Sequence, residues 1–310
     1  MIHPTDSVTP VAEYGRMTTR GWVTKRRAWG ALALLATATA GLGVVAPTGA
    51  AAQTPPTSYV ALGDSFTSGP LIPNQSLEPL GCLRSDRNYP HLIAPNTGTQ
   101  AFRDVSCAGA DTNDLYSEHG VWPGPNPPQL NALDANTRVV TVGMGGNDIG
   151  FSGIIESCAS ALPFGSPCRN RYVVNGVDEL TNRINATAPK IAAAVAAIRA
   201  RSPQARILVV GYPAIVPDSG SGCWPSVPMA WNDVPYLRAK HKELNAMLAG
   251  QAAAQGAVYV DTYTPSIGRD ACASGGTRWV EPLIPGNAAA PFHPNARGMQ
   301  GMATAVRARL

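Results

Sequence analysis

Five short apolar runs recur along the chain, each rich in β-branched side chains and each followed by a polar or glycine-rich turn. They cover residues 60–62, 101–107, 138–142, 206–210 and 257–260. None of them alternates cleanly between apolar and polar positions. Because a strand covered on both faces has no solvent side, this pattern predicts buried strands of a parallel sheet.

Segments of helical character separate and follow the later runs. Residues 177–201 place apolar side chains at helical spacing and end before Ser202 and Pro203. Residues 235–255 are rich in Ala, Leu, Lys and Glu, and residues 294–310 begin with a proline, which suits a first helical turn. The stretches 70–100, 111–135, 158–172, 215–234 and 263–292 are expected to be loops. Strands that alternate with helices predict one α/β domain with a doubly wound parallel sheet.

The first 52 residues differ in composition from the rest of the chain. Lys25, Arg26 and Arg27 precede an apolar, alanine-rich run, and small residues follow up to Ala52. This order is typical of a secretory signal peptide cleaved after Ala52, although the paired arginines also fit a twin-arginine signal loosely. A membrane anchor is the alternative, but the run is short and is diluted by glycine and threonine. We therefore expect a secreted domain over residues 53–310.

Much of the positive charge lies in this leader. The formal net charge is +4, but the leader holds five of the 24 basic and two of the 20 acidic residues, which leaves the predicted domain at +1. A nearly neutral domain gives no reason to expect nucleic acid or an anionic surface as a partner. With 45% hydrophobic residues, the chain can bury the core of one large domain or two small ones.

All the cysteines lie in the predicted domain, at Cys82, Cys107, Cys158, Cys168, Cys223 and Cys272. An even number of cysteines in an exported chain indicates three disulfides, and spacing alone leaves many pairings open. The chain has no Cys-x-x-Cys, and no histidine lies close to a pair of cysteines. We therefore expect neither a metal nor a cofactor.

Unusual polar residues stand where the first three strands end. The strands run into Gly63-Asp64-Ser65, towards Gly109 and into Asn147. Ligands of an open parallel sheet bind outside the carboxyl ends of its strands. A serine there needs a base to become a nucleophile, and His293 is the candidate because its ordinary pKa lies near neutrality. Each motif alone most often does no more than shape a turn, but their order along the chain is specific.

Together, the motifs resemble those of the GDSL-type SGNH hydrolases, and specifically the secreted bacterial esterases and lipases with three disulfides. The matching blocks are Gly63-Asp64-Ser65, Ser106 to Gly109, Gly145-Gly146-Asn147-Asp148 and His293-Pro294-Asn295. The resemblance covers essentially all of the predicted domain, including the order of the cysteines. It implies a three-layer, flavodoxin-like SGNH hydrolase fold with a mostly five-stranded parallel sheet, and ester hydrolysis at its carboxyl edge.

The resemblance also implies a role for each residue. Ser65 is the expected nucleophile, His293 is its base, and the reaction passes through an acyl-serine intermediate. The N–H groups of Ser65 and Gly109 and the side chain of Asn147 are the expected oxyanion-hole donors. The implied disulfides pair Cys82 with Cys107, Cys158 with Cys168, and Cys223 with Cys272.

One position departs from the family pattern. Many members carry an aspartate three residues before the histidine, where this chain has Ala290. We expect the carbonyl of Ala290 or Pro291 to accept a hydrogen bond from Nδ1 of His293, which gives a serine–histidine dyad with a backbone third member. Glu281 and Asp270 are the alternatives, but both are expected to be solvated loop charges.

These observations predict a secreted carboxylic-ester hydrolase that acts as a monomer on lipids or other acyl esters. A lipase or phospholipase is favoured because the loop 215–234 is apolar enough for transient contact with a lipid surface. The predicted loops also carry tryptophans that can line an acyl groove or a sugar platform, at Trp122, Trp224, Trp231 and Trp279. A polysaccharide deacetylase with the same site is therefore one alternative, and a catalytically silent exported binding protein is another.

Overall fold

Five parallel strands form one sheet, as expected from the apolar runs, and the structure gives their order as β2-β1-β3-β6-β7. Their bounds are Ser58–Gly63 for β1, Ala101–Asp104 for β2, Thr137–Gly143 for β3, Arg206–Val210 for β6 and Val258–Val260 for β7. The computed structural model describes residues 56–310, so the predicted signal peptide lies outside the described residues.

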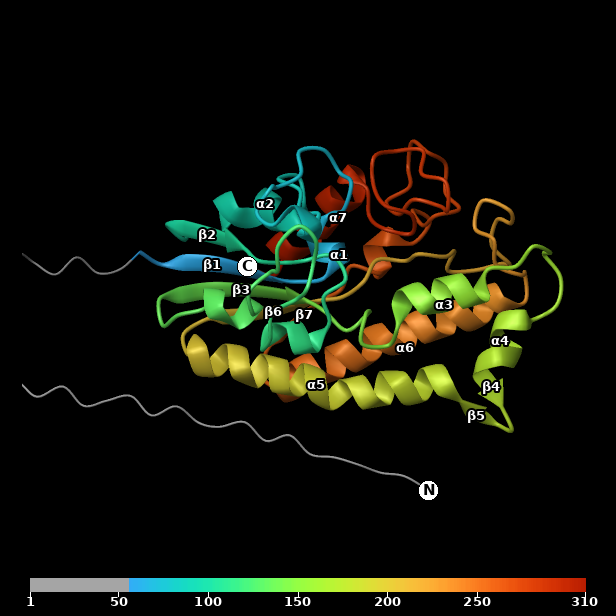
Figure 1. Cartoon of the computed structure of the whole chain (residues 1–310), viewed down its shortest axis with the longest axis horizontal. Helices are drawn as coiled ribbons and strands as arrows, with labels where there is room; N and C mark the ends of the chain where they lie inside the picture. The colour runs from blue at the N-terminus through green and yellow to red at the C-terminus, as the bar shows by residue number, and fades with distance from the viewer. Residues whose placement is uncertain (1–55) are drawn as a thin grey trace, which may run out of the picture. The chain divides into compact units, whose positions relative to one another are not determined.

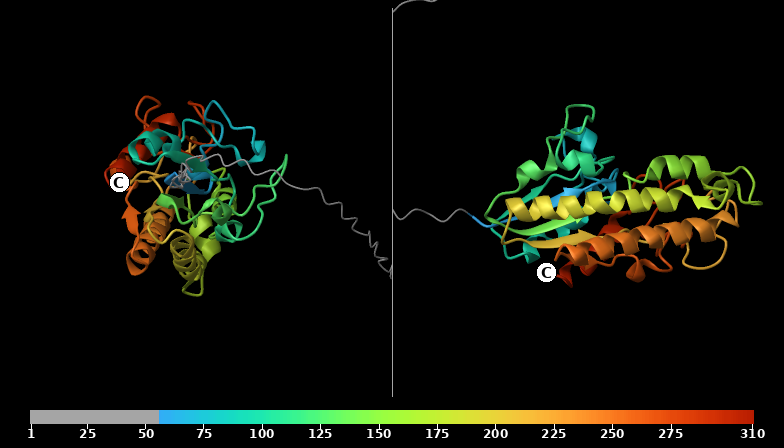
Figure 2. Two further views of the ribbon diagram at one scale, coloured as in Figure 1. Left: turned by 90° about the vertical axis from the view of Figure 1, so that its left-hand side faces the viewer. Right: turned by 90° about the horizontal axis from the view of Figure 1, so that it is seen from below.

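Helices cover both faces of the sheet and complete three layers (Figure 1). On one face, α2 (Tyr89–Ile93) packs against α7 (Ala296–Arg307), and on the other α5 (Glu179–Arg201) packs against α6 (Asp233–Ala254). Seen from below in Figure 2, α5 and α6 lie side by side and continue past the ends of the strands. The shorter α3 (Phe151–Cys158) lies at the same projecting end.

Each central strand divides its side chains between two hydrophobic cores. Tyr59 and Ala61 of β1 belong to the core beneath α2 and α7, whereas Val60 and Leu62 belong to the core beneath α5 and α6. All four side chains are fully buried. Burial on both faces explains why the strand sequences show no alternation of polar and apolar positions.

Some expected boundaries are wrong. The long helix begins at Glu179 rather than at residue 177, because β5 (Val177–Asp178) pairs antiparallel with β4 (Val173–Val174). The stretch 70–100, expected to be a loop, contains α2. Two-residue strands and five-residue helices are too short to show a period in the sequence.

The stretch 158–172, also expected to be a loop, contains α4 (Pro167–Tyr172). The carboxylate of Asp233 in α6 accepts hydrogen bonds from the N–H groups of Cys168 and Arg169 at 3.0 and 2.9 Å. These N–H groups lie in the first turn of α4 and have no partner within the helix. This helix thus depends on a distant residue and could not be predicted from local sequence. The remaining short helices are 3-10 turns at Leu80–Cys82, Ala94–Asn96, Thr112–Leu115, Gln129–Ala132 and Thr264–Ser266.

Three disulfides tie the irregular segments together, and their pairing is the sequential one that the resemblance implies. Cys82 bonds to Cys107, Cys158 to Cys168, and Cys223 to Cys272. Within residues 56–310, no helix combines the length and the hydropathy needed to cross a membrane. The same residues contain no group of three or more His, Cys, Asp or Glu side chains placed to hold a metal ion.

Candidate active site

Ser65 stands at the first position of a short helix that begins where β1 ends. Asp64 caps this helix, α1 (Ser65–Ser68), because its Oδ1 accepts the N–H of Phe66 at 2.8 Å. A glycine precedes the cap because a Cβ at Gly63 would collide with the side chain of Thr67. The sharp turn brings the hydroxyl of Ser65 to the carboxyl edge of the sheet.

His293 reaches Ser65 from the segment before α7. Its Nε2 lies 2.8 Å from Ser65 Oγ, and its Nδ1 lies 2.7 Å from the carbonyl oxygen of Pro291. When Nδ1 carries the proton and donates to that carbonyl, Nε2 is free to accept the proton of the serine. The carbonyl of Ala290 instead accepts the backbone N–H of His293 at 3.2 Å. Phe66 packs against the imidazole, with ring centroids 4.9 Å apart, and limits its rotation.

A buried carboxylate holds the loop that carries His293. Glu281 is 0% exposed and accepts hydrogen bonds from Nδ2 of Asn295 and of Asn287, at 2.6 and 2.8 Å. Its own backbone N–H donates to the carbonyl of His293 at 3.0 Å. Burial alone would raise the pKa of Glu281, but these hydrogen bonds hold it below its usual value. The expectation that Glu281 and Asp270 are solvated charges is wrong, because Asp270 is buried too.

The expected oxyanion donors lie around the same edge of the sheet. Asn147 lines a cavity together with Ser65, and its Nδ2 donates to the carbonyl of Ala110 at 2.8 Å, which leaves one amide hydrogen free. Gly109 has a φ of 85°, a conformation that favours glycine. Among residues 56–310, the N–H groups of Ser65 and Gly109 donate to no protein acceptor. Donors of this kind stabilise a developing oxyanion when they point at it.

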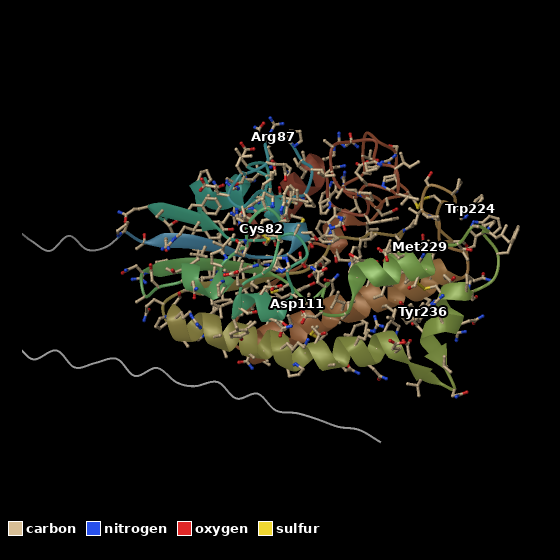
Figure 3. All side chains as sticks on the ribbon, in the orientation of Figure 1. Cys82, Arg87, Asp111, Trp224, Met229 and Tyr236 are labelled. Atoms are coloured by element: carbon tan, nitrogen blue, oxygen red, sulfur yellow. A yellow bond between two sulfur atoms is a disulfide. The ribbon has the colours of Figure 1, made fainter. Side chains whose placement is uncertain are left out.

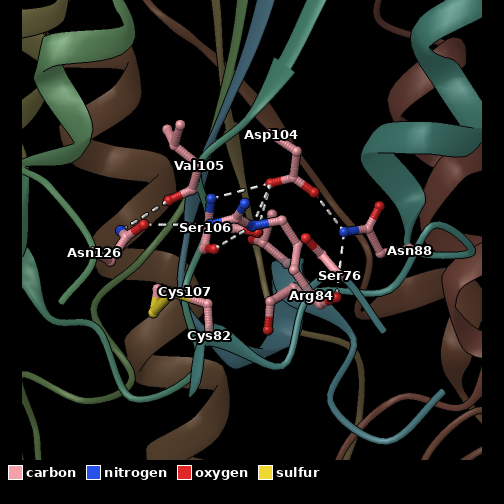
Figure 4. Close-up of polar contacts among 12 residues, drawn as sticks. Ser76, Cys82, Arg84, Asn88, Asp104, Val105, Ser106, Cys107 and Asn126 are labelled. Carbon is pink, nitrogen blue, oxygen red and sulfur yellow. Dashed lines mark hydrogen bonds and ion pairs between the residues drawn. A yellow bond between two sulfur atoms is a disulfide. The ribbon is translucent and has the colours of Figure 1, made fainter. Parts of the chain in front are cut away.

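A buried polar network holds the segment before Gly109 (Figure 4). Nε of Arg84 donates to the carbonyl of Ser106 at 2.8 Å. Asp104 accepts the N–H and the hydroxyl of Ser106 at 3.0 and 2.6 Å, and its other oxygen accepts from Asn88 at 2.6 Å. The network therefore joins the end of β2 to the loop before α2.

Two residues outside the sequence motifs join these motifs to one another. The hydroxyl of Tyr212 donates to Oδ2 of Asp64 at 2.6 Å and accepts the N–H of Gly146 at 2.8 Å. The side chain of Gln129 makes two hydrogen bonds to the backbone of Gly63, at 2.8 and 3.0 Å. Tyr212 closely follows β6, so its place at a strand end could have marked it as a site residue. Gln129 lies in a predicted loop, and nothing in the sequence marked it.

Comparison with known proteins decides the family. The profile described as "GDSL-like Lipase/Acylhydrolase family" matches residues 61–300. The chain belongs to this family. "Lipase 2" of Streptomyces coelicolor is 42% identical to it over 259 residues, which cover 82% of this chain and 85% of that protein. The expected family is therefore confirmed, and this GDSL-family protein is a hydrolase of ester bonds.

Solved structures confirm the fold. The extracellular lipase of Streptomyces rimosus matches with a TM-score of 0.68 and 27% identity, covering 82% of this chain and 100% of that one. Phospholipase A1 from Streptomyces albidoflavus NA297 matches with a TM-score of 0.65 and the same coverage. Its identity is only 24%, so it shows similarity of fold alone.

Ser65 of the GDSL-family site lines an apolar cavity together with residues of α3, α5 and α6. The cavity encloses about 80 Å³. Its apolar lining consists of Phe66, Ile149, Phe151, Ile154, Ile155, Leu180, Ile215, Val216, Met229, Leu237 and Leu244. The four loop tryptophans are absent from the lining, so the structure gives them no part in either an acyl groove or a sugar platform at this cavity.

His241 also lines the cavity, which its place between two lysines in the sequence did not indicate. Its ring packs edge-on against Tyr263, with centroids 5.2 Å apart. Burial lowers the pKa of His241 to about 4, so the imidazole is neutral at pH 7. Lysines on both sides of His241 would suggest a solvated helix face, but the ring lies against the cavity instead.

We expect the acid limb of kcat/KM to have its midpoint below pH 6.5. Burial lowers the pKa of His293 from its usual 6.5, and the hydrogen bond to Pro291 opposes this shift without reversing it. A base must be neutral to accept the serine proton, so hydrolysis should rise as pH rises through this pKa. The profile is measured with a soluble ester. Burial also raises the pKa of Asp64 to about 7, so Asp64→Asn is the control that removes this second titration. A midpoint above 6.5 in that variant would contradict the prediction.

We expect Tyr212→Phe to lower both stability and turnover, because it leaves Gly146 N–H and one oxygen of Asp64 unpaired in a buried site. A buried polar group without a partner lowers the free energy of unfolding by about 1–3 kcal/mol. Because part of this cost appears in the transition state, we expect kcat to fall roughly tenfold. Tyr59→Phe is the matched control, since it removes a buried hydroxyl that lies 2.8 Å from Thr141 Oγ1. The control should lose stability but keep its kcat. Equal kcat values in the two variants would show that Tyr212 is structural only.

Proposed function

We propose that this protein is a secreted esterase or lipase that cleaves esters of extended acyl chains through an acyl-serine intermediate. The observation that carries the proposal is the apolar cavity that Ser65 lines, because a nucleophile in the wall of such a cavity can attack an ester whose acyl chain fills it. The lipase names of relatives support the same substrate class. The three disulfides and the extracellular S. rimosus lipase support secretion.

The mechanism follows from the hydrogen bonds around Ser65. Its Oγ attacks the ester carbonyl while Nε2 of His293 takes its proton, and the carbonyl of Pro291 holds Nδ1–H throughout. The oxyanion that forms accepts hydrogen bonds from the N–H groups of Ser65 and Gly109 and from Asn147. Collapse breaks the ester bond, and His293 returns the proton to the departing alcohol. Water then attacks the acyl-serine by the same steps, which releases the acid and restores the serine.

In this site a backbone carbonyl, not a carboxylate, accepts the Nδ1–H of His293, and this affects how well the transition state is stabilised. The oxygen of Pro291 orients the imidazole and selects its tautomer, but it carries no net charge. It therefore stabilises the imidazolium of the transition state less than a carboxylate would.

The cavity argues against the alternative functions. An acetyl group would leave most of the apolar lining unfilled, and no tryptophan stands at the cavity to stack on a sugar ring. A silent binding protein would not need the 2.8 Å contact between His293 and Ser65, or free N–H groups beside it. Both alternatives remain outcomes of the experiment that follows.

The test combines p-nitrophenyl esters from acetyl to palmitoyl with an alkyl phosphonate that traps the nucleophile. We expect kcat/KM to rise from acetyl to longer acyl chains, and the phosphonate to label Ser65 with one equivalent by mass spectrometry. Leu237→Trp narrows the cavity at a half-buried position near the start of α6, before the other residues of that helix that line the cavity. It should lower activity on palmitoyl esters and leave the acetyl ester unchanged. A preference for acetyl over every longer chain would favour the deacetylase, and neither turnover nor labelling would favour the binding protein.

A further inference from the structure

The projecting end of the molecule exposes large apolar side chains from two loops. Leu162 is 64% exposed, Phe164 65% and Trp231 42%. We call these three residues the tip patch. The apolar composition of the loop 215–234 predicted lipid contact there, but Val227 and Met229 of that loop are buried. Most of the exposed apolar surface therefore comes from the other loop, between Cys158 and Cys168.

The tip patch is held in place by hydrogen bonds between the two loops. The N–H of Trp231 donates to the carbonyl of Pro163 at 2.8 Å, and the N–H of Ser160 donates to the carbonyl of Pro228 at 2.7 Å. The rings of Phe164 and Trp231 meet edge-on with centroids 5.3 Å apart. Because the backbone is paired and the disulfide brackets the first loop, the exposure belongs to an ordered surface.

Met229 connects the loops that carry the tip patch to the apolar cavity beside Ser65. Met229 lines the cavity, and its backbone bridges to Ala159 at the start of the loop that carries Leu162 and Phe164. Ile154 and Ile155 of α3 line the cavity just before that loop. Figure 3 shows Met229 and Trp224 at the end of the molecule where α3 and α6 project past the sheet. The segments 154–164 and 229–231 thus contribute both to the lining of the cavity and to the tip patch.

The distribution of charged side chains around the tip patch favours a lipid surface as its partner over an uncharged apolar surface. Neither residues 159–168 nor residues 219–232 include a charged side chain. Arg169 and Arg171 on α4, which follow the first loop, are exposed and form no ion pair within residues 56–310. One exposed carboxylate, Glu156 on α3, precedes the same loop, so the two arginines outnumber it. Apolar residues that enter the acyl boundary, flanked by arginines at the level of the head groups, are typical of proteins that lie on anionic membranes.

We propose that the tip patch docks this enzyme on the surface of a phospholipid bilayer that carries anionic lipid, with Arg169 and Arg171 on the head groups. The inference rests on the proposed function, since it supplies acyl esters to the cavity from a lipid phase. Ordered apolar exposure of this kind marks an interaction surface in soluble proteins. Contact of the patch with a second copy or another protein is treated as an outcome of the test.

The test measures binding to vesicles of ether-linked lipids, which the enzyme cannot hydrolyse. One set contains phosphatidylcholine with phosphatidylglycerol, and the other contains phosphatidylcholine alone. We expect Leu162→Asp combined with Phe164→Asp to weaken partitioning at least about tenfold, because each side chain loses its apolar burial and gains a charge. Arg169→Glu combined with Arg171→Glu should weaken binding only to the anionic vesicles, and more so at low salt.

Controls separate docking from catalysis and from folding. Leu77→Asp changes an apolar residue that is 76% exposed on another loop, and it should leave vesicle binding unchanged. All variants should hydrolyse soluble p-nitrophenyl butyrate within about twofold of the wild type. Unchanged vesicle binding in the aspartate variants would overturn the proposal, as would a wild-type dimer that only these variants disrupt. Failure to hydrolyse the soluble ester would instead count against the proposed function.

Discussion

Ser65→Ala should lower kcat for soluble esters by roughly four to six orders of magnitude without changing the melting temperature by more than a few degrees. The variant keeps the cavity and the oxyanion donors but has no oxygen to form the acyl intermediate. His293→Ala should cost a similar factor, because the serine is a poor nucleophile without its base. The double variant should be no slower than either single variant, since the two side chains act as one unit.

A second serine on the same short helix provides a matched control. The hydroxyl of Ser68 is buried and has no hydrogen-bond partner among residues 56–310. Ser68→Ala should therefore leave kcat unchanged and be neutral or slightly stabilising. If Ser65→Ala retained more than about one per cent of wild-type kcat, or if Ser68→Ala lost as much, Ser65 would not be the nucleophile.

Asn147→Ala should lower kcat by roughly a hundredfold to a thousandfold, with KM little changed. The free amide hydrogen would stabilise charge that exists only after the nucleophile has attacked, so its loss should appear in turnover rather than in binding. Kinetics on p-nitrophenyl butyrate, with kcat and KM determined separately, measure the two effects.

A same-sized substitution distinguishes charge stabilisation from shape. Asn147→Asp keeps the volume of the side chain but replaces a donor with an anion at the place where negative charge develops. It should be at least as slow as the alanine variant. An aspartate variant with near wild-type kcat would mean that Asn147 only shapes the turn after β3, which was the simpler interpretation of its position.

The features that could be predicted from the sequence are those set by residues that are neighbours in the chain. The β-branched strands, the long helices and the Gly63-Asp64-Ser65 turn depend on neighbours within a few positions, so their pattern was visible in the chain. The resemblance then supplied the pairing of the cysteines and named Ser65 and His293, which the fold brings to 2.8 Å across a separation of 228 residues. The short helix α4 was not predicted because the carboxylate that accepts its first N–H groups belongs to Asp233, on another helix.

By itself, the sequence predicted the family and the sheet, and the resemblance to the family supplied the residues that we propose as nucleophile, base and oxyanion donors. Only the tertiary structure decided which carbonyl lies at Nδ1 of His293, that Glu281 is buried beneath the histidine loop, and that Tyr212 bridges Asp64 and Gly146. It also decided that Phe164 faces solvent while Met229 lines the cavity. The physical reason is the same in each case: burial and hydrogen-bond partners are set by segments that meet only when the chain is folded, and no local pattern records them.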